Sequence, residues 1–381
     1  MYKRICDLEL SRNESVFLWG PRQTGKSTLL KALFPEAPYY DLLLSEEYRR
    51  LVAHPEILRE ECLAQNIRGG TQRKPVVIDE VQNEVHGLIE NRGIRFVLCG
   101  SSARKLKRGQ RNLLGGRAVR YELFPLVYPE MTDLTLSRAL TSGLLPRHYL
   151  ADDSFRLLQS YVGDYLREEI AAEALTRNIP AFSRFLEVAA LTNGELVNYS
   201  NIARECGLSA PTVQSYFQIL EDTLIGSFLP TFRHRMKRRT IGAPKFYFFD
   251  VGIVGSIVRR GRVLAGSELF GRAFEHFLYM ELRAHSSYSG LFYPISFWRT
   301  ASGFEVDFIL GDHQVAIEVK ATERAQSAHL KGLRAFKEEI KAKDYLLITQ
   351  DPRPRNTDDG IQIVPWRRFL GRLWNGDIIR S

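Results

Sequence analysis

Short apolar runs alternate with helix-like stretches through the first third of the chain. Each run is rich in branched or aromatic residues and too short for a helix, as are strands buried on both faces of a parallel sheet. This order predicts an α/β domain with a parallel sheet. The expected strands are Ser15–Trp19, Ala37–Leu44, Pro75–Ile78, Ile94–Cys99 and Ala118–Leu123, and the expected helical stretches are residues 28–34 and 45–66.

Two later segments alternate apolar and charged side chains, as strands with one buried face do. Alternation places Glu305 and Asp307 on one face of the first segment, and Glu318 and Lys320 on one face of the second. A turn at Gly311 joins the segments, so pairing as a hairpin would bring Asp307, Glu318 and Lys320 together. The opposite, apolar faces are predicted to be Val306, Phe308 and Leu310 in the first strand and Val315, Ile317 and Val319 in the second.

The loop after the first strand reads G-x-x-x-x-G-K-S, the pattern of a phosphate-binding P-loop. Its glycines let the backbone curve around phosphates, and the following helix N-terminus adds partial positive charge. Lys26 is expected to reach the β- and γ-phosphates of ATP, and the Ser27 hydroxyl to ligate Mg²⁺. A glycine turn that binds nothing is the competing interpretation, and the strand–loop–helix context argues against it. The expected nucleotide contacts are Gly20, Pro21, Arg22, Gln23, Thr24, Gly25, Lys26, Ser27 and Thr28.

The run Val76–Ile78 ends in Asp79 and Glu80, the pattern of a Walker B strand. Its carboxyl end is expected beside the P-loop, where ligands bind in open α/β sheets. Asp79 would hold Mg²⁺ through water, and Glu80 would act as the general base that polarises the attacking water. After the next strand, Ser101 or Ser102 could sense the γ-phosphate, although a plain helix N-cap explains a serine there equally well.

Arg104 and Arg117 are candidates for an arginine finger that reaches the nucleotide of a neighbouring subunit in a homo-oligomer. Solvent-facing or structural arginines are the commoner case, so the sequence leaves both assignments open.

The middle of the chain predicts helices over residues 126–192, followed by a helix-turn-helix. Asn198–Gly207 reads as a short helix that ends in glycine, and Ser209 caps the next helix with Pro211 in its first turn. Leu224–Leu229 and Lys245–Phe249 would complete a winged helix. The basic run between these strands could contact DNA phosphates, or the module could dock against protein with the run as a solvated loop. The basic residues are Arg233, Arg235, Lys237, Arg238 and Arg239.

The ordered set Glu275, Asp307, Glu318 and Lys320 is the constellation of PD-(D/E)XK nucleases, in a helix–strand–strand context. Glu275, Asp307 and Glu318 would bind Mg²⁺ or Mn²⁺, and Lys320 would activate water and stabilise developing charge. The competing interpretation is a solvated strand face with cross-strand ion pairs. Catalytic roles are therefore expected for Asp307, Glu318 and Lys320, although sites on such folds are often lost or repurposed.

The stretches GPRQTGKSTL, VVIDEVQ, CGSS and GRAVRYELFPL resemble the AAA-type ATPases that precede a domain of unknown function, DUF4143, and are usually described only as ATP-binding proteins. Ala243–Gly252 resembles the signature of that paired domain. The resemblance implies an additional-strand P-loop core of the AAA+/ASCE type, a helical lid and a nuclease-like C-terminal domain. The expected domains are residues 1–130 for the ATPase core, 131–192 for the lid, 193–250 for the winged helix and 251–381 for the restriction-endonuclease-like α/β domain.

Composition sets bounds on these interpretations. The 381 residues carry a net charge of +9, which permits nucleic-acid binding without proving it. Four scattered cysteines suit a reducing cytoplasm, and no signal peptide or membrane-length apolar run is visible. The main hypothesis is a cytoplasmic Mg²⁺-dependent ATPase that acts on nucleic acid through a nuclease-like domain. The alternatives are a nucleotide-switched scaffold with an inert nuclease fold, and a nucleic-acid remodeller without cleavage.

Overall fold

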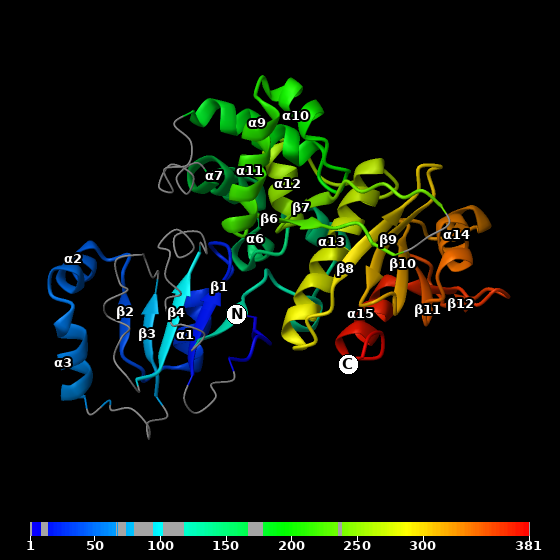
Figure 1. Ribbon diagram of the computed structural model, residues 1–381. Coiled ribbons are helices and arrows are strands. Elements are labelled where there is room, and N and C mark those ends of the chain that lie inside the picture. Colours follow the sequence, from blue (N-terminus) through cyan, green and yellow to red (C-terminus); the bar gives the residue numbers. More distant parts are fainter. Residues whose placement is uncertain are drawn as a thin grey trace. The chain divides into compact units, whose positions relative to one another are not determined.

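The computed structural model of this chain describes residues 2–8, 14–65, 67, 74–79, 94–101, 118–166, 178–234 and 238–380 (Figure 1). The chain divides into two compact units. The P-loop unit is Arg4–Pro125 with Ile219–Ile225, and the C-terminal unit is Met1–Lys3, Leu126–Gln218 and Gly226–Ser381. Six residues singled out in the sequence lie outside the described residues: Glu80, Ser102, Arg104, Arg117, Arg235 and Lys237.

The P-loop unit is built on a five-stranded parallel sheet in the order β2-β3-β4-β1-β5. β4 lies between the P-loop strand β1 and the Walker B strand β3, which is the additional strand implied by the resemblance. β1, β3 and β4 are fully buried, as their apolar runs predict. The elements are β1 (Ser15–Trp19), α1 (Lys26–Leu33), β2 (Tyr39–Asp41), α2 (Ser45–Ala53), α3 (Glu56–Ala64), β3 (Val76–Asp79), β4 (Phe96–Gly100) and β5 (Ala118–Glu122).

The parallel register fixes where chemistry can occur in this unit. Trp19, Asp79 and Gly100 end neighbouring strands, so the P-loop, the Walker B acid and Ser101 all follow the carboxyl edge of one sheet. Ligands of open α/β sheets bind at this edge. The predicted α/β class with a parallel sheet is confirmed.

The first part of the C-terminal unit is helical and ends in a two-stranded antiparallel sheet. Gly207 closes α10 in the left-handed conformation (φ 66°), and the Ser209 hydroxyl accepts a hydrogen bond from Thr212 N at 3.2 Å, as the sequence predicts. The elements are the 3₁₀ turn η2 (Tyr128–Glu130), α5 (Leu136–Ser142), α6 (Pro146–Leu150), α7 (Ser154–Ser160), the π-helical η3 (Tyr161–Tyr165), α9 (Ile179–Leu191), α10 (Tyr199–Cys206), α11 (Ala210–Asp222), β6 (Gly226–Leu229), β7 (Lys245–Phe248) and α12 (Val251–Ile257).

A six-stranded mixed sheet in the order β12-β13-β11-β10-β9-β8 forms the rest of this unit. Side chains of α13 and α15 share one buried cluster with one face of the sheet, and side chains of α14 share another with the opposite face. The elements are α13 (Glu268–Tyr288), β8 (Ile295–Arg299), β9 (Glu305–Leu310), β10 (Val315–Val319), the 3₁₀ turn η4 (Ser327–Leu330), α14 (Lys331–Glu339), β11 (Asp344–Thr349), β12 (Arg355–Asn356), β13 (Gln362–Pro365) and α15 (Trp366–Trp374).

The strands β9 and β10 pair as the predicted antiparallel hairpin, but β9 does not alternate regularly. Phe308 and Leu310 pack on the α13 side, whereas Val306 packs on the α14 side. The cause is a register shift against β8, since Ser296 pairs with Ile309 but Trp298 pairs with Val306. One extra residue of β9 is thus accommodated as a bulge. The prediction of a single apolar face for Val306, Phe308 and Leu310 is wrong, while that for Val315, Ile317 and Val319 is confirmed.

In the part of the chain that the structure describes, no helix has both the length and the apolar character needed to cross a bilayer.

Candidate functional sites

The P-loop curves tightly between β1 and α1. Gln23 and Gly25 both take positive φ, at 63° and 94°, and a side chain at position 25 would be strained in this conformation. Lys26 turns back over the loop and donates to the carbonyl oxygens of Gly20, at 2.8 Å, and Pro21, at 3.0 Å. The N-cap residue of α1 is Gly25, which has no side chain to occupy the first N–H groups of the helix, and such N–H groups suit an anion. Ser27 and Thr28 are exposed at this end of the helix.

The Arg4 side chain stabilises the P-loop, a contact that sequence reasoning missed. Its guanidinium donates to Thr24 O at 2.6 Å and to Phe124 O at 2.7 Å. The Thr24 hydroxyl in turn donates to Pro21 O at 2.9 Å. These contacts tie the loop to the end of β5 and hold its shape in advance of any ligand.

The Walker B carboxylate of Asp79 is almost completely buried at the end of β3. Tyr39 donates a short hydrogen bond to Oδ2, whereas Oδ1 is buried and has no hydrogen-bond partner among the described residues. Burial opposes ionisation, but the neighbouring Cys99, Ser27 and Tyr39 side chains and the charge of Lys26 hold the pKa of Asp79 below its usual value. An ionised carboxylate with one spare oxygen, close to the Ser27 hydroxyl, fits Mg²⁺, which takes oxygen ligands.

Ser101 directly follows β4 and is buried, at the sheet edge where a γ-phosphate sensor was predicted. The sensor role itself stays a prediction.

We predict that Tyr39→Phe raises the Mg²⁺ concentration needed for half-maximal ATP hydrolysis by roughly tenfold, because outer-shell partners of metal ligands typically matter at this level. The Tyr39 hydroxyl donates to Oδ2 of Asp79 and so restrains the carboxylate that is expected to hold Mg²⁺. The measurement is a Mg²⁺ titration of the ATPase rate at saturating ATP.

Tyr40→Phe is the matched control for this experiment. Tyr40 adjoins Tyr39 on β2, but its hydroxyl donates to Glu61 at 2.9 Å and not to Asp79. An equal shift in both variants would assign the Tyr39 effect to general loosening of β2.

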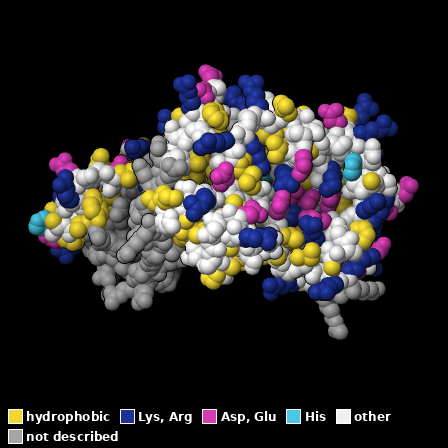
Figure 2. All heavy atoms as spheres, turned by 90° about the horizontal axis from the view of Figure 1, so that it is seen from above, with side chains coloured by type: hydrophobic (Ala, Val, Ile, Leu, Met, Phe, Trp, Pro, Cys, Tyr) yellow, Lys and Arg dark blue, Asp and Glu magenta, His cyan; other side chains and the backbone are white. Residues whose placement is uncertain are grey.

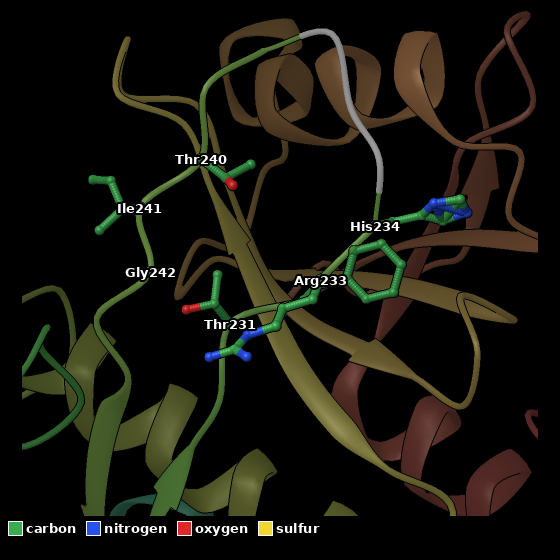
Figure 3. Close-up of a pocket in the computed structure, with 7 residues that line it drawn as sticks. Thr231, Arg233, His234, Thr240, Ile241 and Gly242 are labelled. Carbon is green, nitrogen blue, oxygen red and sulfur yellow. The ribbon is translucent and has the colours of Figure 1, made fainter.

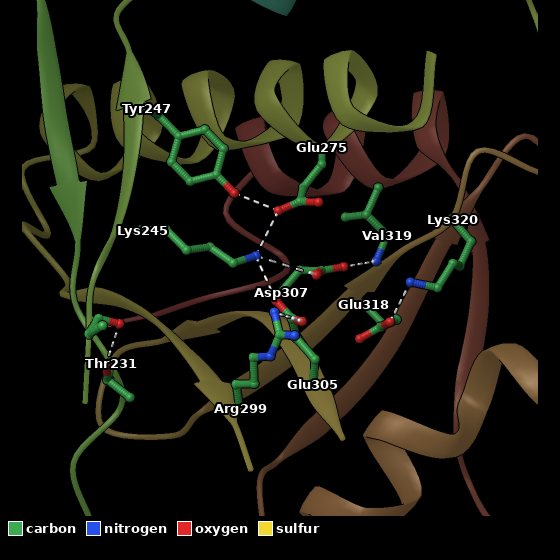
Figure 4. Close-up of polar contacts among 11 residues, drawn as sticks. Thr231, Lys245, Tyr247, Glu275, Arg299, Glu305, Asp307, Glu318, Val319 and Lys320 are labelled. Atoms are coloured by element: carbon green, nitrogen blue, oxygen red, sulfur yellow. Dashed lines mark hydrogen bonds and ion pairs between the residues drawn. The ribbon is translucent and has the colours of Figure 1, made fainter. Parts of the chain in front are cut away.

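The C-terminal unit contains a buried cluster of charges between β7, α13 and the bulged strand β9 (Figure 4). At its centre is Lys245, with a side chain only 4% exposed. Its ammonium lies 3.0 Å from Glu275 Oε1, 2.7 Å from Glu305 Oε1 and 4.0 Å from Asp307 Oδ1. Tyr247 also donates to Glu275, at 2.5 Å.

Three further contacts complete the cluster. Asp307 Oδ2 accepts from Val319 N at 2.8 Å, Glu318 pairs with Lys320 at 2.5 Å, and Arg299 pairs with Glu305 Oε2 at 3.2 Å. The second oxygen of Glu318 is buried without a hydrogen-bond partner in the described part of the chain.

The pKa values of the acids diverge according to their partners. Burial opposes the charge of Glu275, but Lys245 and Tyr247 more than compensate and lower its pKa. Burial and the negative charge of Glu275 raise the pKa of Asp307 to about 7. Burial and the neighbouring Asp307 raise the pKa of Glu318 well above its usual value. Of Glu275, Asp307 and Glu318, only Glu275 is therefore stabilised as an anion, and its counter-ion is Lys245.

This geometry departs from the predicted metal site. The four predicted residues Glu275, Asp307, Glu318 and Lys320 do gather in one region (Figure 4). However, the described residues include no group of three acid, His or Cys side chains placed to hold a metal ion. The position between Glu275 and Asp307 is taken by an ammonium, and Glu318 is engaged with Lys320. As arranged here, Glu275, Asp307 and Glu318 do not fit a shared Mg²⁺ or Mn²⁺.

Two described segments, residues 231–234 and 238–242, contain the described part of the basic run, and we call them its two arms. Both arms follow the edge strand β8. Phe232 N donates to Phe297 O at 2.7 Å, and Ile241 N donates to Arg299 O at 2.9 Å. Arg238 pairs with Glu338 and, at 2.9 Å, with Glu339, both on α14. The run is thus partly docked on its own unit through Arg238, whereas Arg233 and Arg239 are exposed.

A pocket of about 540 Å³ lies between the two arms (Figure 3). On the face drawn in Figure 2, Lys and Arg side chains are scattered among Asp and Glu and do not form one continuous basic surface. The residues that line the pocket are Thr231, Phe232, Arg233, His234, Thr240, Ile241 and Gly242.

Comparison with known protein families places the P-loop site and the acidic cluster in the matches of different families. Residues 12–132 match the model of an AAA domain, and residues 270–369 match a domain of unknown function, DUF4143. The chain carries an AAA domain followed by a DUF4143 domain. A further domain of unknown function, DUF8612, matches residues 134–262 between them. The P-loop and Asp79 belong to the AAA domain, whereas Glu275, Asp307 and Glu318 belong to the DUF4143 domain.

Relatives and solved structures add little about function. Uncharacterized proteins of Mycobacterium tuberculosis and Mycobacterium bovis are each 25% identical over 330 residues, covering 82% of this chain and 71% of theirs. A Walker-type ATPase of Pyrococcus abyssi shares 15% identity with a TM-score of 0.41, over 64% of this chain and 90% of that one. The Orc1 protein of Aeropyrum pernix, solved in complex with DNA, shares 12% identity with a TM-score of 0.24, over 65% and 87%. These structural similarities are too low to carry an argument.

Sequence reasoning missed four members of the cluster: Lys245, Tyr247, Arg299 and Glu305. Lys245 and Tyr247 stand in the stretch Ala243–Gly252, which was singled out only for its resemblance to the paired domain. This stretch lies in the DUF8612 match, residues 134–262, and outside the DUF4143 match, residues 270–369. A lysine at alternate spacing with a tyrosine in an otherwise aromatic strand is a usable signal, because a buried ammonium requires nearby acids.

Proposed function

We propose that this AAA-domain protein is a Mg²⁺-dependent ATPase whose nucleotide state controls its DUF4143 domain. The observation that carries the proposal is the shared sheet edge, where the uncapped N-terminus of α1 meets Lys26 and the spare oxygen of Asp79. Each of these groups is matched to part of a metal–nucleotide complex.

The residues divide the work as follows. Residues 20–28 would hold the phosphates through backbone N–H groups, with Lys26 leaving the carbonyls of Gly20 and Pro21 for the β- and γ-phosphates. Ser27 and Asp79 would hold Mg²⁺, which supplies charge neutralisation on the phosphate oxygens. Glu80 would orient and polarise the attacking water. Ser101 is proposed as the γ-phosphate sensor, and Arg104 or Arg117 as an arginine finger in a homo-oligomer.

For the DUF4143 domain, the nuclease-like arrangement rests on the order helix, three antiparallel strands, helix, strand around Glu275, Asp307, Glu318 and Lys320. The specific observation in favour of the second candidate, a nucleotide-switched scaffold without cleavage, is the ammonium of Lys245 among the acids. On this geometry we propose that the domain does not cleave nucleic acid while Lys245 is in place.

One preparation tests both halves of the proposal. ATP hydrolysis and the nicking of DNA and RNA are measured with EDTA, Mg²⁺ or Mn²⁺. Mg²⁺-dependent hydrolysis without nicking is the expected result. Metal-dependent nicking that Asp307→Ala abolishes would instead establish the nuclease. Absence of hydrolysis under every condition would reject the ATPase.

The three helices α9–α11 and the β6–β7 hairpin support a winged helix, which we propose as the nucleic-acid contact of the chain. We predict that replacing Arg233 and Arg239 together by alanine weakens DNA binding on every sequence and lowers the slope of log K against log salt by roughly two, about one per lost phosphate contact. Both side chains are exposed, so no change in melting temperature is expected. The measurement is fluorescence anisotropy across a salt series.

Arg238→Ala is the matched control. Its guanidinium is held by Glu338, Glu339 and Ala335 O, so it should lower the melting temperature and leave the salt slope unchanged. If DNA affinity does not change when Arg233 and Arg239 are replaced, the whole segment that joins β6 to β7 would be assigned to docking on its own unit.

A further inference from the structure

Three of the four acids in the buried charge cluster, Glu275, Glu305 and Asp307, surround one position, and the Lys245 ammonium occupies it. The Lys245 ammonium contacts Glu275 and Glu305 and lies 4.0 Å from Asp307. We propose that Lys245 is the resident cation of this cluster and takes the place that a divalent metal holds in a catalytic nuclease site, so that the wild-type domain binds no metal there. This inference rests on the nuclease-like arrangement proposed above.

The strand that carries Lys245 is built to deliver it. Along β7 the side chains alternate, with Phe246 against Phe217 and Phe228 on one face and Lys245 and Tyr247 on the other. Lys245 is further fixed by backbone pairing with Leu229 and by a bridge to Leu196.

The neighbours of Lys245 hold its stem and head in one position. Tyr247 packs on Tyr279 of α13, with ring centroids 4.4 Å apart, and bonds the same oxygen of Glu275 that Lys245 contacts. The Lys245 ammonium lies 5.3 Å from the centre of the Phe297 ring, which adds a cation–π contact. The side chain is therefore part of the packed structure, and it is not a surface lysine that happens to lie near acids.

Charge balance points to the same conclusion. In formal charges, with every group counted as ionised, four carboxylates face three cations: Glu275, Glu305, Asp307 and Glu318 against Lys245, Lys320 and Arg299. A divalent ion would therefore have to displace the buried ammonium. Without Lys245, the same formal count leaves two more carboxylates than cations, which one divalent ion would balance. Glu275, Glu305 and Asp307 would have to move closer together to bind that ion, because no three such side chains among the described residues are placed to hold a metal while Lys245 is present. Glu305 would then take the place that the sequence assigned to Glu318.

The test compares Lys245→Met with the wild-type chain, both free of nucleotide. Methionine retains most of the apolar stem and removes the charge. In EDTA the variant should melt lower by on the order of 10 °C, because breaking a buried ion pair leaves uncompensated charge. Millimolar Mn²⁺ should restore a large part of the loss in Lys245→Met and leave the wild type unchanged. Adding Asp307→Asn to Lys245→Met should abolish the Mn²⁺ effect.

Lys320→Met is the matched control for the loss of a lysine in the same cluster. Among the described residues the Lys320 ammonium forms an ion pair with Glu318 alone, and its side chain is 39% exposed, so the loss should be smaller. Equal melting losses in the two lysine variants, or no Mn²⁺ rescue of Lys245→Met, would overturn the proposal.

A second measurement does not depend on the folding of the Lys245 variant. Mn²⁺ binding to the wild-type chain and to Asp307→Asn, followed by electron paramagnetic resonance, should be identical. Wild-type binding that Asp307→Asn removes would show a metal at the cluster and reject Lys245 as its cation. The ATPase rates of the same preparations report on the P-loop, so failure of the ATPase proposal is seen separately.

Discussion

Glu80→Gln is expected to keep nucleotide affinity and to lower kcat for ATP hydrolysis by about 10²–10⁴-fold, the usual contribution of a positioned general base. Glu80 lies outside the described residues, and its role follows from its place directly after Asp79 at the end of β3. Glutamine preserves size and removes the basic oxygen, so the phosphate cradle is left intact. Steady-state hydrolysis and fluorescent-nucleotide binding separate the two effects.

Lys26→Ala provides the opposite pattern. It removes the cation that now donates to the carbonyl oxygens of Gly20 and Pro21, and the variant should lose nucleotide affinity as well as turnover. Glu60→Gln, an exposed glutamate on α3, controls for loss of a surface charge. Unchanged hydrolysis in both Glu80→Gln and Lys26→Ala would remove the P-loop from the mechanism.

The AAA domain was predictable because its signals are local. Ser15–Trp19 and Val76–Asp79 are short, mostly apolar runs; the first leads into the P-loop, and the second ends in the Walker B acid. A strand buried on both faces of a parallel sheet is expected to be such a continuous apolar run. The topology then follows, since parallel strands need crossovers and their carboxyl ends meet at one edge. The contacts of Arg4 could not be predicted, because its partners are backbone carbonyl oxygens. One of them, Phe124 O, lies 120 residues away in the sequence.

The DUF4143 cluster shows where strand periodicity fails. Regular alternation would keep Val306 and Phe308 on one face, but the bulge in β9 separates them around Asp307. A bulge depends on pairing with β8 and leaves no trace in the sequence of β9 alone. Lys245 was missed for a related reason. It reaches Glu275, Glu305 and Asp307 across tertiary contacts, which no sequence spacing encodes.

The second large effect is expected at Asp250, the acid that ends the aromatic stretch after Lys245. Its carboxylate is fully buried and accepts from Gly252 N at 2.9 Å, Ile253 N at 3.2 Å and Leu144 N at 2.6 Å. It thereby caps α12 and fixes the turn after α5, where Gly143 has φ 72° and an added Cβ would lie 2.0 Å from Oδ1 of Asp250.

We predict that Asp250→Ala lowers the free energy of unfolding by about 4 kcal/mol, since it removes a helix cap and leaves three buried N–H groups without this acceptor. Asp250→Asn retains one acceptor oxygen for the cap and loses the bond from Leu144 N, so its loss should be about half as large. Urea denaturation measures both. Equal stability of Asp250→Ala and the wild type would show that water or another group replaces the cap.

The pH dependence of this pair tests the charge state of Asp250. Burial raises the pKa of Asp250 to about 6, although the three backbone N–H groups oppose the shift. An unfolded aspartate titrates near pH 4, so between about pH 4 and 6 the folded chain binds more protons than the unfolded chain. The stability that Asp250 contributes is then fully present below about pH 4 and falls as the pH rises to 6. The advantage of the wild type over Asp250→Asn should shrink across this window, by at most about 3 kcal/mol. If the advantage grows instead, the N–H groups outweigh burial, and Asp250 caps α12 as a stabilised anion.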